Sequence, residues 1–241
     1  MSLLFEAGAR PCAADIRALA KGDVPFSISI DPSVDGTADE GWVELLVNGL
    51  TFDLTGLAPF PAAEMPCANH YYGLSEGFPQ LSLEAITLVP GPHLTAGGIM
   101  FPVVRGLAAL AADLTDLPRV QGVVWHPAHA VSEPAYFQRG VTSWIEGGPF
   151  PGLGLTALIT NSDGSMQSDG LALFTGQELH LPADVTGDGA EGAKLALRIL
   201  NWLVEHGKIE QNVTFTGPSG EPMGVEPVEN SGMLRVWRGT R

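Results

Sequence analysis

The stretch from Asp169 to Leu181, DGLALFTGQELHL, constrains the fold of this chain more than any other. Its leucines all lie at odd-numbered positions: Leu171, Leu173, Leu179 and Leu181. A spacing of two predicts strands with one buried face, because successive side chains of a strand point to opposite faces. Thr175 and Gly176 break the pattern in the middle. We therefore expect this stretch to supply strands to a half-buried sheet.

Strand and helix patterns mix along the rest of the chain and predict an α+β fold. Asn48-Gly49 separates two strand-like runs, residues 42–47 and 50–54, and is a strong hairpin signal. Residues 189–206 form the clearest helix, apolar over so much of its circumference that we expect burial on more than one side. The expected fold is a mixed, largely antiparallel sheet with three to four helices packed mainly on one face.

The other predicted helices begin at recognisable signals. One covers residues 13–21, and another begins near Phe101, because proline at position 102 suits a first helical turn. A third begins at Ser132 as its N-cap. Between the predicted elements, residues 56–82 are irregular and rich in proline. We expect an N-terminal lobe over residues 1–82 and a main α+β unit over residues 83–241, with one continuous domain as the alternative.

Composition and charge exclude several classes of protein. The chain has 241 residues, 45% of them hydrophobic, and a net charge of −15 from 27 acidic and 12 basic residues. Such a charge repels nucleic-acid phosphates and anionic membrane surfaces. We find no apolar run of about 18 residues, no signal peptide and no pair of closely spaced cysteines. We therefore expect a soluble, cytoplasmic protein that binds neither nucleic acid nor membrane.

Four segments resemble, in order, a known family. They are FPAAEMPCANHYY (60–72), GVVWHPAHAVSEPAYF (122–137), DGLALFTGQEL (169–179) and GKIEQNVTF (207–215). They are similar to the bacterial domain-of-unknown-function family forty-two sixty-one, which has no assigned activity. The positions that match its pattern are Pro61, Glu64, Asn69, Trp125, Phe137, Gly170, Leu171, Phe174 and Glu178. The glycine expected after Phe174 is shifted by one position, and the family's glycine-rich ending is absent. The resemblance implies a bacterial, soluble α+β protein.

His126 and His129 are the best candidates for metal ligands. Two histidines three residues apart near a strand end can share one ion, because imidazole is the commonest ligand of zinc-like metals. A catalytic zinc needs a third ligand, for which Glu133, near in sequence, and Glu178 or His70, if near in space, are candidates. The alternative is that both histidines are ordinary loop residues in contact with water.

Two other groups are candidates for chemistry. Glu178 lies in an apolar stretch, so it is either a general base or ligand in a cleft, or a group that supports the backbone of a loop. His70 belongs to the cluster Asn69-His70-Tyr71-Tyr72, which either lines a small-molecule pocket or covers the core. Cys67 is near His70 in sequence and is a weaker candidate nucleophile.

The chain contains no phosphate-binding loop and no nucleophile elbow. We therefore expect a non-catalytic protein that binds a protein partner or a small ligand, with self-association as a further option. The alternative is a metal-assisted hydrolase that uses His126, His129 and Glu178. No cofactor is required by the sequence, and a divalent metal is the one that the alternative would need.

Overall fold

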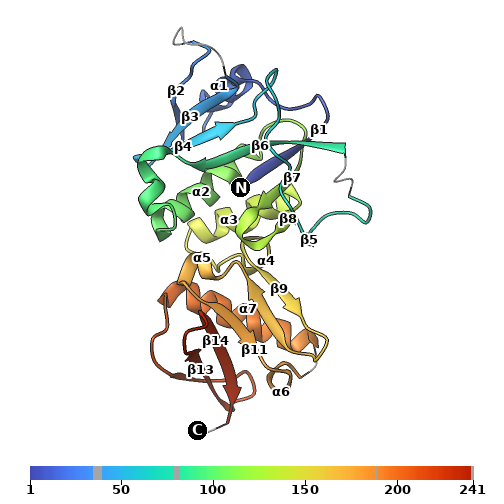
Figure 1. Ribbon diagram of the computed structural model, residues 1–241, viewed down its shortest axis with the longest axis vertical. Coiled ribbons are helices and arrows are strands. Elements are labelled where there is room, and N and C mark those ends of the chain that lie inside the picture. Colours follow the sequence, from blue (N-terminus) through green and yellow to red (C-terminus); the bar gives the residue numbers. More distant parts are fainter. Residues whose placement is uncertain (35–39, 79–81, 188, 240–241) are drawn as a thin grey trace. The chain divides into compact units, whose positions relative to one another are not determined.

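The computed structural model describes residues 1–34, 40–78, 82–187 and 189–239. The chain divides into two compact units, Met1–Gly148 and Pro149–Arg241 (Figure 1). The boundary that we expected after residue 82 falls inside the first unit. The reason is that the strand beginning at Leu83 pairs with strands formed by residues 2–6 and 50–55.

The first unit is built on an eight-stranded sheet with the order β2-β3-β4-β6-β1-β7-β8-β5. Neighbouring strands are antiparallel, except that β5 and β8 are parallel. The predicted hairpin is confirmed: Asn48 and Gly49 have φ values of 50° and 78° and join β3 to β4. The strands are β1 (Ser2–Glu6), β2 (Ser27–Ile30), β3 (Trp42–Val47), β4 (Leu50–Thr55), β5 (His70–Tyr72), β6 (Leu83–Pro90), β7 (Val120–Trp125) and β8 (Ala130–Ser132).

The helices of this unit are α1 (Ala13–Ala20), α2 (Phe101–Leu114) and α3 (Pro134–Ile145), with 3-10 turns η2 (Pro92–Gly97) and η3 (His126–Ala128). The predicted start of α2 at Phe101 is confirmed. The predicted cap at Ser132 is wrong, because Ser132 ends β8. Glu133 is the cap instead, and its carboxylate accepts hydrogen bonds from the backbone N–H groups of Ala135 and Tyr136.

The two faces of the eight-stranded sheet are covered differently. α2 packs on β4 and β6, and α3 packs on β7. The opposite face is covered by the irregular segment of residues 63–78, so this segment is part of the core rather than a linker. Partly buried apolar residues of the segment pack against a buried cluster of sheet residues. The sheet residues are Leu4, Ala85, Val124 and Val131, and the segment residues are Ala63, Met65, Ala68, Leu74 and Phe78.

The second unit has a six-stranded sheet with the order β12-β13-β14-β11-β10-β9, in which β11 and β14 are parallel. Its strands are β9 (Ala157–Thr160), β10 (Met166–Asp169), β11 (Glu178–Leu181), β12 (Val213–Thr216), β13 (Pro222–Val228) and β14 (Met233–Arg238). Its helices are α4 (Gly152–Leu155), α5 (Ala172–Thr175), α6 (Ala183–Thr186) and α7 (Gly189–His206). α7 has the predicted bounds and packs on β10 and β11.

The α+β class is confirmed, but the expected helix number and packing are wrong. The described part of the chain contains seven α-helices, and they belong to two sheets rather than to one face of a single sheet. Three of the seven, α4, α5 and α6, have only four residues each, which is too short for a sequence pattern to reveal. Among the described residues, no helix has both the length and the apolar character needed to cross a bilayer.

Candidate functional site

An open hollow of about 600 Å³ lies in the first unit, between the sheet and the segment that covers it. Thr55 on β4 and Thr87 on β6 are cross-strand partners and provide the sheet side of the hollow. Residues 63–67 and the turn after β7 provide the rest. The residues that line it are Thr55, Ala63, Glu64, Met65, Pro66, Cys67, Thr87, His126 and His129.

His126 is held in the hollow by a short chain of hydrogen bonds. Its Nε2 lies 2.9 Å from Ser2 Oγ, and Ser2 Oγ lies 2.7 Å from Thr87 Oγ1. Burial lowers the pKa of His126 from its ordinary value of 6.5 to about 4, with smaller contributions from the Met1 amino group and His129. The imidazole is therefore neutral at pH 7, where it can both donate and accept a hydrogen bond.

Ser2 is not a nucleophile activated by His126, although the two side chains are in contact. Ser2 is completely buried, so its hydroxyl cannot reach a bound molecule. A serine nucleophile needs an accessible oxygen beside its base. Ser2 instead fixes the orientation of the imidazole. Of the two hydroxyl groups in this series of hydrogen bonds, only that of Thr87 belongs to a residue that lines the hollow.

The turn that carries His129 is attached to the covering segment. His129 has a left-handed backbone with φ of 48°, and its carbonyl oxygen accepts hydrogen bonds from the N–H groups of Asn69 at 2.8 Å and His70 at 3.1 Å. Cys67 lies two residues before Asn69 in the chain, has an exposed free thiol and lines the same hollow. The fold thus brings together two groups that are far apart in the sequence, the pair His126 and His129 and the segment of residues 60–72.

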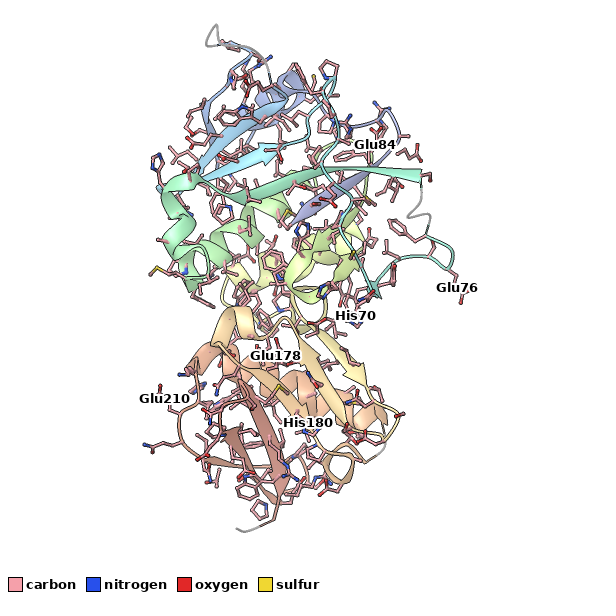
Figure 2. The ribbon with its side chains drawn as sticks, viewed as in Figure 1. His70, Glu76, Glu84, Glu178, His180 and Glu210 are labelled. Atoms are coloured by element: carbon pink, nitrogen blue, oxygen red, sulfur yellow. The ribbon has the colours of Figure 1, made fainter. Side chains whose placement is uncertain are left out.

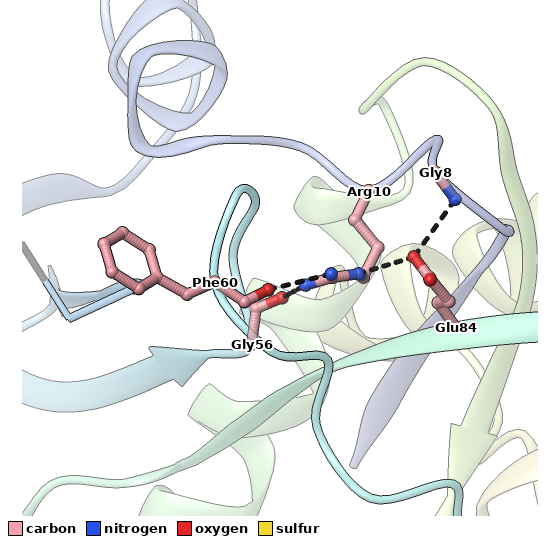
Figure 3. A network of polar contacts seen from close by, with 5 residues as sticks. All are labelled: Gly8, Arg10, Gly56, Phe60 and Glu84. Carbon is pink, nitrogen blue, oxygen red and sulfur yellow. Dashed lines mark hydrogen bonds and ion pairs between the residues drawn. The ribbon is translucent and has the colours of Figure 1, made fainter.

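Arg10 anchors the chain just before the covering segment (Figure 3). Its Nε donates to Glu84 Oε2 at 2.7 Å, and its two terminal nitrogens donate to the carbonyl oxygens of Gly56 and Phe60, the latter at 2.9 Å. The hydrogen bond from Arg10 is the main reason that the pKa of Glu84 is lowered, and the Gly8 N–H adds to it. The Arg10 side chain is only 9% exposed, so this network fixes the segment just before the hollow.

The other predicted site residues have different positions (Figure 2). His70 begins β5 beside the turn of His129, whereas Glu178 begins β11 in the second unit. Within the described ranges, no group of three or more His, Cys, Asp or Glu side chains is placed to bind a metal ion. His126 and His129 line one hollow, but the described residues give them no third ligand.

Glu178 supports the loop between β10 and β11. Its carboxylate accepts hydrogen bonds from the backbone N–H groups of Gly170 at 3.0 Å, Leu171 at 3.2 Å and Ala172 at 2.9 Å, and from the Ser168 hydroxyl. Burial raises the pKa of Glu178, although the Ser168 hydroxyl and the backbone N–H groups act in the opposite direction. Both carboxylate oxygens are thus engaged in local structure.

Three residues at the site were not predicted from the sequence: Thr55 and Thr87, which line the hollow, and Ser2, which lies buried behind His126. Each is a hydroxyl residue on a strand, and together they face the side of the sheet opposite to α2. Only β4, with the sequence Leu-Thr-Phe-Asp-Leu-Thr, shows the period-two alternation that places polar residues on one face. β1 and β6 have consecutive apolar residues around Ser2 and Thr87, so their sequences carry no such signal. The comparisons with known proteins add no relative, since no family model, no curated protein and no solved structure matches the chain.

Proposed function

We propose that the first unit binds a small, uncharged, hydrogen-bonding molecule in the hollow beside His126. The observation that carries the proposal is the position of the His126 imidazole, which the buried Ser2 fixes at the edge of the open hollow. A group that is fixed before the ligand arrives loses little conformational freedom on binding, which favours affinity. The family resemblance names no activity, so the proposal rests on this geometry.

The chemistry of the lining supports an uncharged polar ligand. Thr55, Thr87 and His126 offer hydroxyl and imidazole groups, which can donate and accept hydrogen bonds. Among the described residues, the lining contains no lysine or arginine, and it includes the carboxylate residue Glu64, so it offers an anion no basic side chain to pair with. Met65 and Pro66 add apolar surface. This mixture suits polyols, sugars and amides, in which polar edges alternate with C–H surface.

Saturation-transfer difference NMR tests the proposal with glycerol, glucose, N-acetylglucosamine and acetamide as probes. We expect saturable transfer to at least one probe with the wild-type protein and loss of that transfer in His126→Leu. The matched control is His93→Leu, because His93 is an exposed histidine of the same unit on η2, outside the hollow. Absence of saturable transfer to all four probes, or equal loss in the two variants, contradicts the proposal.

The metal content of protein purified without a histidine tag tests the alternative. The presence of about one zinc, manganese or iron atom per chain, lost in the double variant His126→Ala and His129→Ala, would favour a metal-assisted hydrolase over a binding protein. A metal content that is the same in wild type and double variant would leave the two imidazoles as hydrogen-bonding groups of the hollow.

A further inference from the structure

We propose a second binding site, in the second unit, for an extended peptide of a partner protein. The peptide adds a strand to the free edge of β12, places an apolar side chain in the groove between β12 and α7, and pairs an acidic side chain with Arg198. Strand addition of this kind obtains its affinity from backbone hydrogen bonds and its specificity from pockets for alternate side chains. Four observations support the proposal.

The first observation is the open edge of β12. This strand is the last of the six-stranded sheet and pairs, among the described strands, with β13 alone. Edge strands are usually protected against added strands by charged residues, proline or bulges. β12 has the sequence Val-Thr-Phe-Thr, which contains no charge and no proline and consists of residues that favour strands. Its edge is therefore suited to accept another strand.

The second observation is an apolar groove beside that edge. α7 packs on β10 and β11, which lie farther along the sheet, and a cavity of about 240 Å³ remains between α7 and the end of β12. The helix lines it with one stripe at positions i, i+3, i+4 and i+7, and β12 with the strand end and the turn that follows. The lining residues are Leu195, Arg198, Ile199, Trp202, Phe215, Thr216, Gly217 and Pro218.

The third observation is an unpaired cation in the lining of this groove. Arg198 is exposed, and among the described residues its guanidinium makes no ion pair and no hydrogen bond. Lys194, one turn earlier on the same helix, is paired with Glu191 at 2.7 Å. An arginine beside apolar surface matches a carboxylate, because the guanidinium donates two parallel hydrogen bonds to it.

The fourth observation distinguishes a partner from a second copy of this chain. Alternate residues of a strand share a face, so a bound peptide needs an apolar and an acidic residue two positions apart to reach both the groove and Arg198. In a second copy of β12, the residue that shares a face with Phe215 is Val213, and Gly217 follows directly after the strand; neither is acidic. The occupant that fits is therefore a partner segment with the pattern apolar-x-acidic.

Fluorescence anisotropy with labelled peptides tests the proposal on the full chain. The probes are eight amidated peptides, Gly-Thr-X-Thr-Z-Thr-Gly, in which X is Val, Leu, Phe or Trp and Z is Glu or Asp. We expect saturable binding of at least one peptide. Arg198→Gln should weaken that binding roughly five- to tenfold, as expected for a charge-assisted hydrogen bond. The matched control Lys194→Gln should change it less than about twofold.

Methylated peptides test the strand addition itself. The best peptide is prepared with N-methyl groups on its odd residues or on its even residues. Since a strand pairs on one side through alternate residues, only one of the two sets should abolish binding. Equal effects of the two sets, equal losses in Arg198→Gln and Lys194→Gln, or equal binding of a peptide with lysine at Z would overturn the proposal. Failure of all eight peptides, or a dimer in sedimentation that excludes the peptide, would overturn it as well.

Discussion

Ser2 Oγ lies 2.9 Å from His126 Nε2 and connects the first strand of the chain to a residue 124 positions later. The contact exists because β1 lies between β6 and β7 in the sheet, so that residues of all three strands share one face. It holds the imidazole in a half-buried position where its charged form is disfavoured. The geometry of the hollow therefore has a consequence for stability that can be measured.

The stability of the first unit should fall as the pH drops from 6.5 to about 4. The folded protein keeps the His126 imidazole neutral in this range, because burial lowers its pKa to about 4, whereas the unfolded chain binds a proton there. Lowering the pKa by this amount should reduce the free energy of unfolding by about 1–3 kcal/mol across this pH range. The lower value allows for solvent screening on the open side of the ring. Urea unfolding of wild type and His126→Leu at pH 7 and pH 4.5 measures it.

The difference between the two proteins isolates His126 from the other titrating groups. Wild type should lose more of its free energy of unfolding than His126→Leu between these pH values. Equal losses would mean that the imidazole is as accessible to protons in the fold as in the unfolded chain.

Arg10→Lys should destabilise the first unit by about 2–4 kcal/mol. Lysine can keep the ion pair with Glu84 but cannot also donate to the carbonyl oxygens of Gly56 and Phe60, which then lose their side-chain donor. Arg17→Lys is the matched control, since the Arg17 side chain is 34% exposed and its ion pair with Asp31 can be replaced. Thermal unfolding of both variants tests the role of Arg10. Similar melting temperatures of the two variants would contradict the prediction.

Glu178→Gln should destabilise the second unit by about 1–3 kcal/mol. The amide has one oxygen acceptor where the carboxylate has two, and each carboxylate oxygen accepts two hydrogen bonds, so two of the four donors from Ser168 and residues 170–172 face an N–H group instead. Urea unfolding followed by tryptophan fluorescence gives the change. Glu210→Gln, at a side chain that is 74% exposed, is the control and should have little effect. Unchanged stability of Glu178→Gln would leave the carboxylate available for another role.

The helix α7 and the β3–β4 hairpin could be predicted because their signals are local. The Asp169–Leu181 stretch shows where local signals fail. The buried residues here are Leu171, Phe174 and Thr175, so the second and third lie three and four positions after the first. This is a helical spacing, because residues 172–175 form a helical turn that ends at Gly176, whose φ is 78°. The period-two pattern describes only the strand Glu178–Leu181. Four residues are too few to separate the two periods in sequence.

The hollow could be predicted only in part. His126 and His129 were identified by residue type, but their neighbours depend on strand order, which no local pattern determines. β1 is inserted between two strands that follow it by about 80 and 120 residues, so that Ser2 meets both Thr87 and His126. The role of Glu178 was likewise open in the sequence, because a carboxylate in an apolar stretch is compatible with a site or with loop support.

Asp113→Asn should stabilise the protein at pH 7 by about 1–2 kcal/mol. Burial first, and then the charge of Asp116, raises the pKa of Asp113 to about 6, and its Oδ2 is buried without a hydrogen-bond partner among the described residues. A carboxyl whose pKa is raised by folding costs stability above that pKa, and the cost disappears as the pH falls through 6 towards 4. The stabilisation measured by urea unfolding should therefore be present at pH 8 and nearly absent at pH 4. A variant less stable than wild type at pH 8 would contradict this.

Gly224→Ala should destabilise the second unit by at least about 2 kcal/mol. Gly224 on β13 faces Trp237 on β14, and a Cβ atom at position 224 would overlap Cζ2 of the buried indole. The ring belongs to a close-packed interior, so either the indole or the strand pair must move. Gly189→Ala is the matched control, because a Cβ there meets no atom of the described residues within 4 Å. Near-ultraviolet circular dichroism and urea unfolding measure both variants. A Gly224→Ala protein with wild-type stability and spectrum would mean that Trp237 is not packed against this glycine.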